Sequence, residues 1–256
     1  MKTKIKILEK IKFKNPILIE GLPGIGNVGR VAAGYLISEL RMKKFAEIFS
    51  PHFLPLVLLH EDSVVTSLKC EFYYCKSKKN DIIVLTGDTQ SITPEGHYEM
   101  CNKILEFVNK LGVKEIITLG GFSEGKEITD PRVICAVNDK KLIKKYEKYG
   151  INFDVEHQIG TIVGASGLLL GLGKIYNIDG LCIMGETVGF PVLTDPKAAD
   201  KVLQTVVKIL DIKIDLSKLE NIIKIMEGQI KKADEIHKKM IQEISKPAKD
   251  EQTYIG

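Results

Sequence analysis

Residues 17–37 contain the pattern that most restricts how this chain can fold. The apolar run Ile17-Leu18-Ile19 leads into the glycine-rich stretch Glu20-Gly21-Leu22-Pro23-Gly24-Ile25-Gly26-Asn27-Val28-Gly29, and a helix-like segment follows over residues 30–37. This order predicts a buried strand, a tight turn and a helix. The spacing Gly24-x-Gly26-x-x-Gly29 is also that of dinucleotide-binding turns, in which glycines let the backbone approach a pyrophosphate at a helix N-terminus. The turn is therefore either a cofactor site or a structural connection.

A dinucleotide site needs more than this glycine spacing. An acidic residue about 20 positions further on, at the end of the next strand, should bind the ribose hydroxyls. Glu47 lies near that distance but begins a predicted strand, and Pro23 sits inside the turn. No Gly-Lys-Ser or Gly-Lys-Thr follows, which excludes a Walker-type phosphate site. We therefore expect no cofactor and interpret the stretch as a structural strand-to-helix turn. Its members are Gly21, Pro23, Gly24, Gly26 and Gly29.

Buried strands that stop at glycine or polar residues recur along the chain. They are predicted over residues 81–88, 115–122 and 180–187. Helices are predicted over residues 93–111, 139–149 and 197–210, with a further helix ending near Tyr176. Shorter strands are predicted over residues 4–13, 44–49, 54–60, 63–75 and 132–137. Strands that alternate with helices predict an α/β fold with a largely parallel sheet flanked by helices. We assign residues 1–215 to this domain.

Composition and charge exclude several classes of protein. The net charge of +4 is small and evenly spread, and arginine occurs only at Arg30, Arg41 and Arg132. We therefore expect no nucleic-acid partner. The five cysteines have no zinc-ligand spacing with a nearby histidine, so we interpret them as reduced core thiols and expect no metal. We also expect no signal peptide and no membrane contact, since no apolar stretch reaches about 20 residues. The predicted location is the cytoplasm.

The C-terminal part of the chain has a different pattern. Apolar residues recur at helical spacing over residues 219–244, opposite lysines and glutamates. This predicts an amphipathic helix, which we place at residues 216–245, after the α/β domain. The pattern fits equally a helix that packs across the domain and one that pairs with a partner helix. Residues 246–256 are polar and broken by Pro247, which predicts a flexible tail.

Polar residues at strand ends provide an alternative, enzymatic interpretation. In a parallel sheet such residues meet in the crevice beyond the carboxyl ends of the strands. The candidates are Asp88, Glu95, His97, Glu124 and Glu186. A nucleoside phosphorylase or hydrolase would line this crevice with the glycine turn, Asp88, Glu124 and Glu186, and Arg30 would bind phosphate. The competing interpretation of the same residues is helix capping, turn formation and subunit contacts. The chain contains no Gly-x-Ser-x-Gly serine elbow.

Four motifs occur in a fixed order between residues 17 and 210. They are the glycine-rich stretch of residues 20–29, the turn Leu119-Gly120-Gly121-Phe122 with Gly125 after it, the segment Gly164-Ala165-Ser166-Gly167-Leu168-Leu169, and the run from Gly185-Glu186-Thr187 to Asp195-Pro196-Lys197-Ala198-Ala199. Together they resemble the archaeal proteasome assembly chaperone family. The resemblance implies a nucleoside-phosphorylase-like α/β fold unrelated to the ATP-grasp fold. It further implies a homo-oligomer, trimer to pentamer, without catalytic activity.

The resemblance also gives the C-terminus a role. Some family members resemble proteasome activators that end in a hydrophobic residue, a tyrosine and any residue. The tyrosine hydroxyl and the terminal carboxylate of that motif fit between adjacent α-subunits of the proteasome ring. Here Tyr254 is third from the end and Thr253 takes the place of the hydrophobic residue, so the register differs by one position. Tyr254, Ile255 and Gly256 would bind as a variant of the motif, with several tails acting together.

The resemblance therefore implies an ATP-independent proteasome assembly chaperone or adaptor. Its expected partners are proteasome α-subunits or the α-ring, further copies of this chain, and a second family member. The alternative is the nucleoside phosphorylase or hydrolase described above. A third interpretation is an oligomeric scaffold for an unrelated partner.

Overall fold

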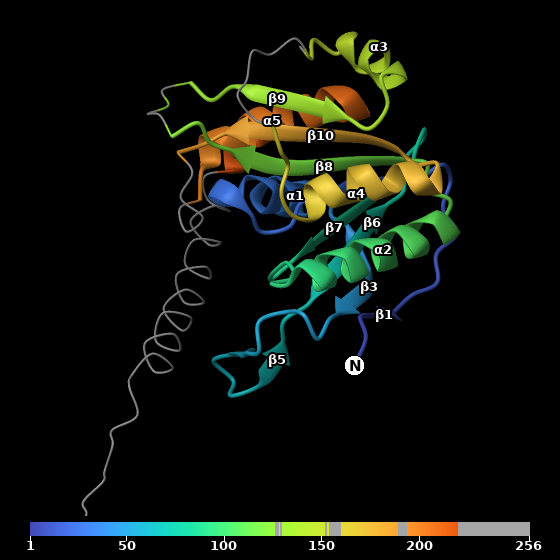
Figure 1. The fold of residues 1–256 in the computed structure, drawn as a ribbon, viewed down its shortest axis with the longest axis vertical. Coiled ribbons are helices and arrows are strands. Elements are labelled where there is room, and N and C mark those ends of the chain that lie inside the picture. The colour runs from blue at the N-terminus through green and yellow to red at the C-terminus, as the bar shows by residue number, and fades with distance from the viewer. Residues whose placement is uncertain (126–127, 129, 152, 154–159, 189–193, 220–256) are drawn as a thin grey trace, which may run out of the picture.

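A sheet of eight strands organises the part of the chain that the computed structural model describes, which comprises residues 1–125, 128, 130–151, 153, 160–188 and 194–219. The strand order is β1-β3-β6-β7-β2-β8-β10-β9, and a separate two-stranded sheet is formed by β4 and β5 (Figure 1). The strands are β1 (Lys4–Ile7), β2 (Ile17–Glu20), β3 (Lys43–Phe49), β4 (Val57–Leu59), β5 (Val65–Ser67), β6 (Cys70–Cys75), β7 (Ile82–Gly87), β8 (Glu115–Phe122), β9 (Val133–Val137) and β10 (Asp179–Glu186).

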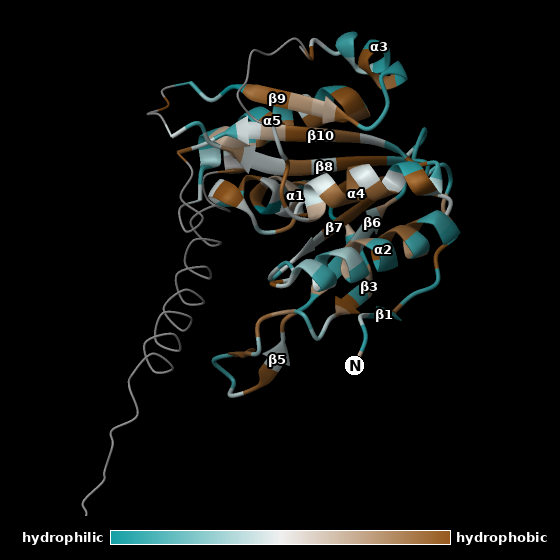
Figure 2. Ribbon diagram, in the orientation of Figure 1, coloured by the Kyte–Doolittle hydropathy of each residue, from teal (hydrophilic) through white to brown (hydrophobic). Residues whose placement is uncertain are grey.

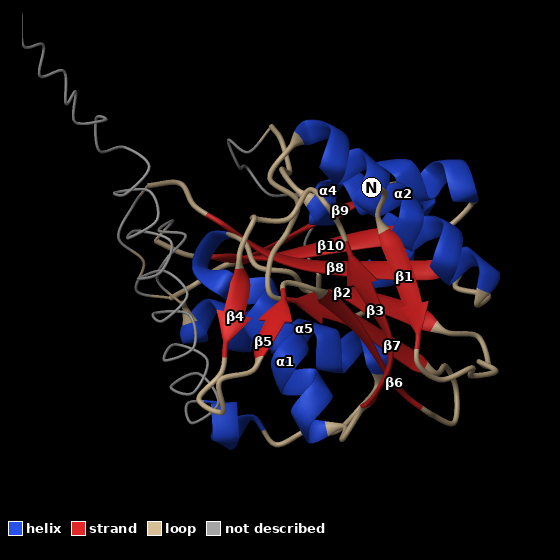
Figure 3. Ribbon diagram, turned by 90° about the horizontal axis from the view of Figure 1, so that it is seen from below, coloured by secondary structure: helices blue, strands red, loops and turns tan. Residues whose placement is uncertain are grey.

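Helices cover both faces of this sheet. The α-helices are α1 (Val28–Glu39), α2 (Pro94–Lys110), α3 (Lys141–Glu147), α4 (Ala165–Gly173) and α5 (Pro196–Leu210), and short 3-10 turns are η1 (Ile25–Asn27), η2 (Lys174–Tyr176) and η3 (Leu216–Lys218). Seen along the sheet, α2 and α4 lie on one side and α1 and α5 on the other (Figure 3). The predicted α/β fold with helices flanking the sheet is confirmed.

The direction of the strands divides the sheet into a parallel centre and antiparallel margins. β7, β2, β8 and β10 pair in parallel. The pairs β1 with β3, β3 with β6, β6 with β7 and β10 with β9 are antiparallel. The sheet is thus mixed, and its parallel part is confined to the four central strands. Of the antiparallel pairs, β6 and β7 are joined by a short connection, which cannot lead back into a parallel strand.

Each central strand is apolar on both sides because both sides are covered. In β2, Leu18 packs toward α2 and α4, whereas Ile19 packs toward α1 and α5. Both side chains are fully buried. This explains the continuous apolar runs of the central strands, which are typical of parallel strands covered by helices on both faces. In Figure 2 the brown of β8 and β10 marks the same pattern.

The shorter strands differ from their predicted bounds. The strand predicted over residues 4–13 stops at Ile7, and the strand over 54–60 is reduced to Val57–Leu59, after Pro55, which has no N–H to donate. The stretch 63–75 splits into β5, which pairs with β4, and β6, which joins the main sheet. The β4–β5 hairpin therefore projects from the domain (Figure 1).

The helices predicted over residues 93–111 and 197–210 begin at Pro94 and Pro196, and both have capped N-termini. Thr93 Oγ1 accepts a hydrogen bond of 3.0 Å from the Gly96 N–H, and Asp195 Oδ1 accepts one of 2.9 Å from the Ala198 N–H. These bonds satisfy N–H groups that have no partner inside the helix. The helix predicted over 139–149 is shorter, and the one predicted to end near Tyr176 ends at Gly173 and continues as η2.

The last described residues run back against α1. The Tyr35 hydroxyl donates to the carbonyl oxygen of Asp215, and the Asp215 N–H donates to Glu39 Oε2 at 3.3 Å. Leu219 is buried in the core cluster that contains α1 and α5. Residues 220–256, which hold most of the predicted amphipathic helix and the whole tail with Tyr254, Ile255 and Gly256, lie outside the described residues. The division at residues 215 and 245 stays a prediction.

Candidate functional site

The glycine turn between β2 and α1 places the helix directly on the sheet. A Cβ atom on Gly21 would lie 2.2 Å from the carbonyl oxygen of Gly29, and one on Gly29 would lie 2.1 Å from the carbonyl oxygen of Leu119 in β8. These distances are far below van der Waals contact, so only glycine fits at either position. The two residues let α1 lie against β2 and β8 at the carboxyl ends of these strands.

The other half of the turn is filled by the connection between β10 and α5. Gly26 has φ of 62°, which favours glycine, and a Cβ there would lie 2.7 Å from Thr187 Oγ1. The Asp195 N–H donates to the Gly26 carbonyl oxygen at 2.9 Å. The space that a pyrophosphate would use in a dinucleotide site therefore holds protein atoms. Pro23 and Gly24 form the outer part of the turn, and Gly24 is exposed.

Gln90 ties the glycine turn to the N-terminus of α4. Its Nε2 donates to the Pro23 carbonyl oxygen at 2.6 Å, and its Oε1 accepts from the Ala165 N–H at 2.9 Å. Gly164, which precedes α4, has φ of 88° and brings its backbone against Gln90. Three segments that are distant in the sequence, 21–29, 88–92 and 164–166, thus meet at one end of the sheet. They include two of the motifs on which the family resemblance rests.

Two of the predicted crevice residues share one partner. Arg132 donates from Nη2 to Glu186 Oε1 at 2.6 Å and from Nε to Glu186 Oε2 at 2.8 Å, and Glu124 Oε2 lies 3.1 Å from Arg132 Nη2. These contacts raise the pKa of Arg132. A guanidinium that binds one carboxylate through two nitrogens forms a strong, fixed pair. Glu124 and Glu186 therefore both bind Arg132, at the place where the ends of β8 and β10 meet the start of β9.

The other two predicted crevice residues lie near β6 and β7. Asp88 Oδ2 accepts a hydrogen bond of 3.1 Å from the Lys69 N–H. Burial lowers the pKa of Arg30, and the negative charge of Asp88 partly offsets this effect. Asp88 follows β7, and Glu186 ends β10, three strand positions away, a separation of about 14 Å. The structure thus brings together Glu124 with Glu186, and Arg30 with Asp88, but not all four around one centre.

Glu95 and His97 lie in the first turn of α2. Glu95 is exposed, and an acidic side chain at this position interacts favourably with the helix dipole. Burial lowers the pKa of His97, and its Nδ1 is buried with no hydrogen-bond partner among the described residues. Neither side chain has a hydrogen bond to Asp88, Glu124 or Glu186 in the described part of the chain.

Comparison with known proteins identifies the family. The model of the PAC2 family matches residues 18–234. The chain belongs to the PAC2 family. Among PAC2 relatives, the uncharacterized protein MJ1210 of Methanocaldococcus jannaschii is 38% identical over 255 residues, which cover 99% of this chain and 96% of that protein. The match runs through all four motifs that indicated the family.

Two solved structures from Pyrococcus furiosus are also similar. PbaB, described as an archaeal proteasome activator, is 43% identical with a TM-score of 0.81, and the match covers 91% of this PAC2 chain and 99% of PbaB. PbaA, described as an archaeal homolog of proteasome-assembly chaperone, is 27% identical with a TM-score of 0.74, with 91% and 96% covered. The fold of the PAC2 chain is therefore that of these proteins.

Glu20 is a buried acid that the sequence interpretation of this PAC2 chain did not select. It ends β2 and is fully buried. Its Oε1 accepts from the Leu22 N–H at 3.1 Å, and Ser166 Oγ of α4 donates to its Oε2 at 3.0 Å. Burial raises the pKa of Glu20 to about 7. The signal was an acidic residue that directly continues a fully apolar strand.

Cysteine and metal chemistry add no further site within the described ranges of the PAC2 chain. Its five cysteines are free, and four of them are buried, which raises the pKa of each thiol above its usual value. No group of three or more His, Cys, Asp or Glu side chains there is arranged to hold a metal ion. In the same part of the chain, no helix has the length and apolar character needed to cross a membrane.

Proposed function

We propose that this protein is an ATP-independent chaperone or adaptor for proteasome assembly, which binds proteasome α-subunits partly through its C-terminal residues. The similarity to PbaB, described as a proteasome activator, carries the proposed proteasome partner, since it reaches 43% identity and covers nearly the whole of both chains. The similarity to PbaA, at lower identity, supports the same class of partner.

The arrangement at the carboxyl ends of the strands supports a non-enzymatic role. Glu124 and Glu186 both form ion pairs with Arg132, so the two acids already have a partner within the protein. Arg30 and Asp88 lie several strands away, and the glycine turn is packed with protein atoms. A nucleoside phosphorylase needs an anion site beside a convergent acid, so this geometry disfavours the enzymatic alternative.

The β4–β5 hairpin supports the proposal of a homo-oligomer. Val57, Leu59 and Val65 lie on the same face of the hairpin and are 50%, 69% and 57% exposed. A two-stranded hairpin with an uncovered apolar face is marginal by itself, and such faces commonly mark protein contacts. We infer that subunits of one assembly meet through this face. We further propose a nucleoside-phosphorylase-like fold and a cytoplasmic location. The proposed assembly is a trimer to pentamer, with a second family member as a further partner.

Removal of the C-terminal residues tests the proposed tail contact. The full chain is compared with a chain that ends at Gln252 and with the variants Tyr254→Ala and Ile255→Ala. Binding to immobilised proteasome α-subunits is measured together with the native mass. Because several tails act together in one oligomer, loss of the tail should weaken binding at least about tenfold without changing the mass or the fold.

Gln252→Ala is the matched control, since it changes a polar residue next to the motif, and it should bind like the full chain. If the shortened chain binds α-subunits as strongly as the full chain, the tail contact is wrong. If no form of the protein binds α-subunits, the proposed partner is wrong.

A further inference from the structure

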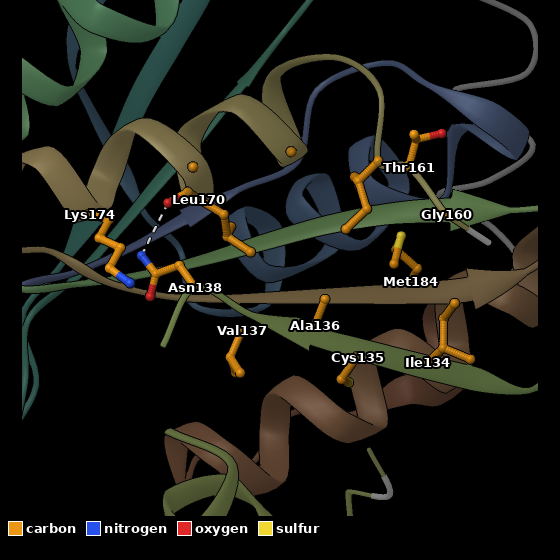
Figure 4. A pocket seen from close by; sticks show the side chains of 13 residues that line it. Ile134, Cys135, Ala136, Val137, Asn138, Gly160, Thr161, Leu170, Lys174 and Met184 are labelled. Carbon is orange, nitrogen blue, oxygen red and sulfur yellow. Dashed lines mark hydrogen bonds between the residues drawn. The ribbon is translucent and has the colours of Figure 1, made fainter. Parts of the chain in front are cut away.

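A groove of about 460 Å³ lies between α4 and the β9–β10 side of the sheet, away from the glycine turn. One wall is the segment of residues 160–162, which packs closely on α4 because a Cβ on Gly167 would lie 2.3 Å from the Ile162 carbonyl oxygen. The lining residues are Ile134, Cys135, Ala136, Val137, Asn138, Gly160, Thr161, Ile162, Gly167, Leu170, Gly171, Lys174 and Met184. Figure 4 shows the groove from close by.

The floor and one side of the groove are apolar. Figure 4 shows Ala136 of β9 and Met184 of β10 directed toward the helix, with Leu170 of α4 directed back toward the sheet. Leu170, Met184 and Ile134 belong to one buried cluster, against which Ala136 and Ile162 pack. On the helix side, Gly171 leaves open space, since a Cβ there would meet no atom within 4 Å. An aliphatic group therefore finds apolar contacts on two sides.

One end of the groove is positively charged. Lys174 and Asn138 lie together there, at the ends of α4 and β9 (Figure 4). The Asn138 amide is fully used, because Nδ2 donates to the carbonyl oxygens of Leu170 and Ile178 and Oδ1 accepts from the Gly180 N–H. Lys174 is exposed, and its ammonium is in none of the ion pairs formed between described residues. The lining contains no acidic side chain, so Lys174 is the charged side chain that an anion would meet among the lining residues.

We propose that this groove binds a medium-chain aliphatic carboxylate, with its chain against Leu170, Ala136 and Met184 and its carboxylate at Lys174 Nζ. The volume falls in the range of about 300–1,000 Å³ usual for small-molecule sites. The lining extends from Gly167 to Lys174 along α4, about 10 Å, and from Ile134 to Asn138 along β9, about 13 Å. These lengths suit an extended acyl chain of medium length. The site is independent of the proposed C-terminal contact.

Binding of decanoate to the full chain tests this site. Titration is followed by two-dimensional amide NMR and by calorimetry below the concentration at which decanoate forms micelles. Shifts should concentrate at residues of α4, β9 and the 160–162 segment. Gly171→Leu fills the open space, suits a helix better than glycine, and should weaken binding at least about tenfold. Lys174→Gln should weaken binding about threefold to fivefold, as expected for one exposed charge pair.

Matched controls separate this site from non-specific binding. Lys110→Gln removes a lysine from the end of α2, outside the groove, and should leave decanoate binding unchanged. Decanol should bind more weakly than decanoate to the native chain and equally to native and Lys174→Gln chains. Absence of decanoate binding, shifts outside the groove, or unchanged affinity in Gly171→Leu would each overturn the proposal. Equal binding of decanol and decanoate would overturn the role of Lys174.

Discussion

At the scale of the residue, Glu20 has the least ordinary environment in the described chain. Its carboxyl group is fully buried, and it joins the glycine turn to α4 through Leu22 N–H and Ser166 Oγ. Burial disfavours the charged form and raises its pKa from 4.5 to about 7. The neutral acid is therefore the form that the folded protein favours below neutral pH. Ionisation at higher pH leaves a buried charge held by two hydrogen bonds.

The pH dependence of stability follows from this shift. Between pH 4.5 and about 7 the unfolded Glu20 ionises while the folded one stays protonated, so the free energy of unfolding falls as the pH rises. The loss is at most about 3–4 kcal/mol and levels off above pH 7. Glu20→Gln keeps a neutral group at this position and should remove this loss of stability with rising pH. Urea unfolding at pH 5 and pH 8 would show a smaller decrease for Glu20→Gln than for the native chain.

Glu95→Gln, at an exposed position of α2, should follow the native pH profile. Parallel profiles for Glu20→Gln and the native chain would contradict the assignment of the pH effect to Glu20.

The residue scale is also where sequence interpretation was least complete. Glu124 and Glu186 were selected because they follow buried strands, but their shared partner Arg132 was noted only as one of three arginines. The pair between Arg132 and Glu186 joins residues 54 positions apart in the sequence. The spacing of neighbouring residues in the sequence gives no information about such a contact. It forms because β9 pairs with β10 in the antiparallel direction. Glu20 was quoted within a motif, but its burial depends on α4, which lies far along the chain.

At the scale of the element, glycine spacing controls how closely a helix approaches the sheet. Gly29 of α1 and Gly171 of α4 are both helical glycines, yet their surroundings are opposite. A Cβ on Gly29 would lie 2.1 Å from a backbone oxygen of β8, and one on Gly171 would meet nothing within 4 Å. Since β8 is a central strand with partners on both sides, it cannot shift to make room. The same residue type therefore has a packing role at position 29 and none at position 171.

Two alanine variants measure this difference. Gly29→Ala should lower the free energy of unfolding by about 3 kcal/mol or more, through overlap with the Leu119 carbonyl. Gly171→Ala should raise it by up to about 1 kcal/mol, because alanine favours the helix. Chemical denaturation of both variants beside the native chain gives the comparison. Similar effects of the two substitutions would mean that α1 does not depend on close contact at Gly29.

The positions of the main elements were largely predictable, because apolar runs and capping residues are local signals. β7, β8, β10, α2 and α5 all lie where the sequence places them. The direction of the strands was not predictable from these local signals, since it depends on which strands pair and how they connect. The predicted strand 63–75 is a clear case: its alternation is continuous, yet Leu68 and Lys69 separate β5 from β6, and the two strands join different sheets.

At the scale of the whole molecule, exposed apolar residues gather at the end of the sheet where the glycine turn lies. Ile25 lies in the turn, Ile92 follows β7, and Val188 follows β10, and they are 41%, 56% and 49% exposed. The β4–β5 hairpin leaves β3 and returns to β6 at the same end, because β3 and β6 are antiparallel and β6 is antiparallel to β7. The hairpin and the loops of the parallel strands thus place exposed apolar residues at the same end of the sheet. Surfaces of this kind commonly bind other proteins.

Leu59→Asp tests whether that surface assembles the subunits. Leu59 is 69% exposed on the outer face of the hairpin, opposite Val65, so a carboxylate there costs little in the isolated subunit but must be desolvated in a subunit contact. We expect native mass measurements to show a smaller assembly with an unchanged fold. Because fewer tails would then act together, affinity for the proteasome α-ring should fall at least about tenfold, whereas binding of one tail to one α-subunit should not change.

Ile175→Asp, at a position 75% exposed on the short turn after α4, is the matched control and should keep the native mass. An unchanged mass for Leu59→Asp would exclude the hairpin from the subunit contact, and a smaller assembly with undiminished affinity for the ring would show that a single subunit is sufficient for binding.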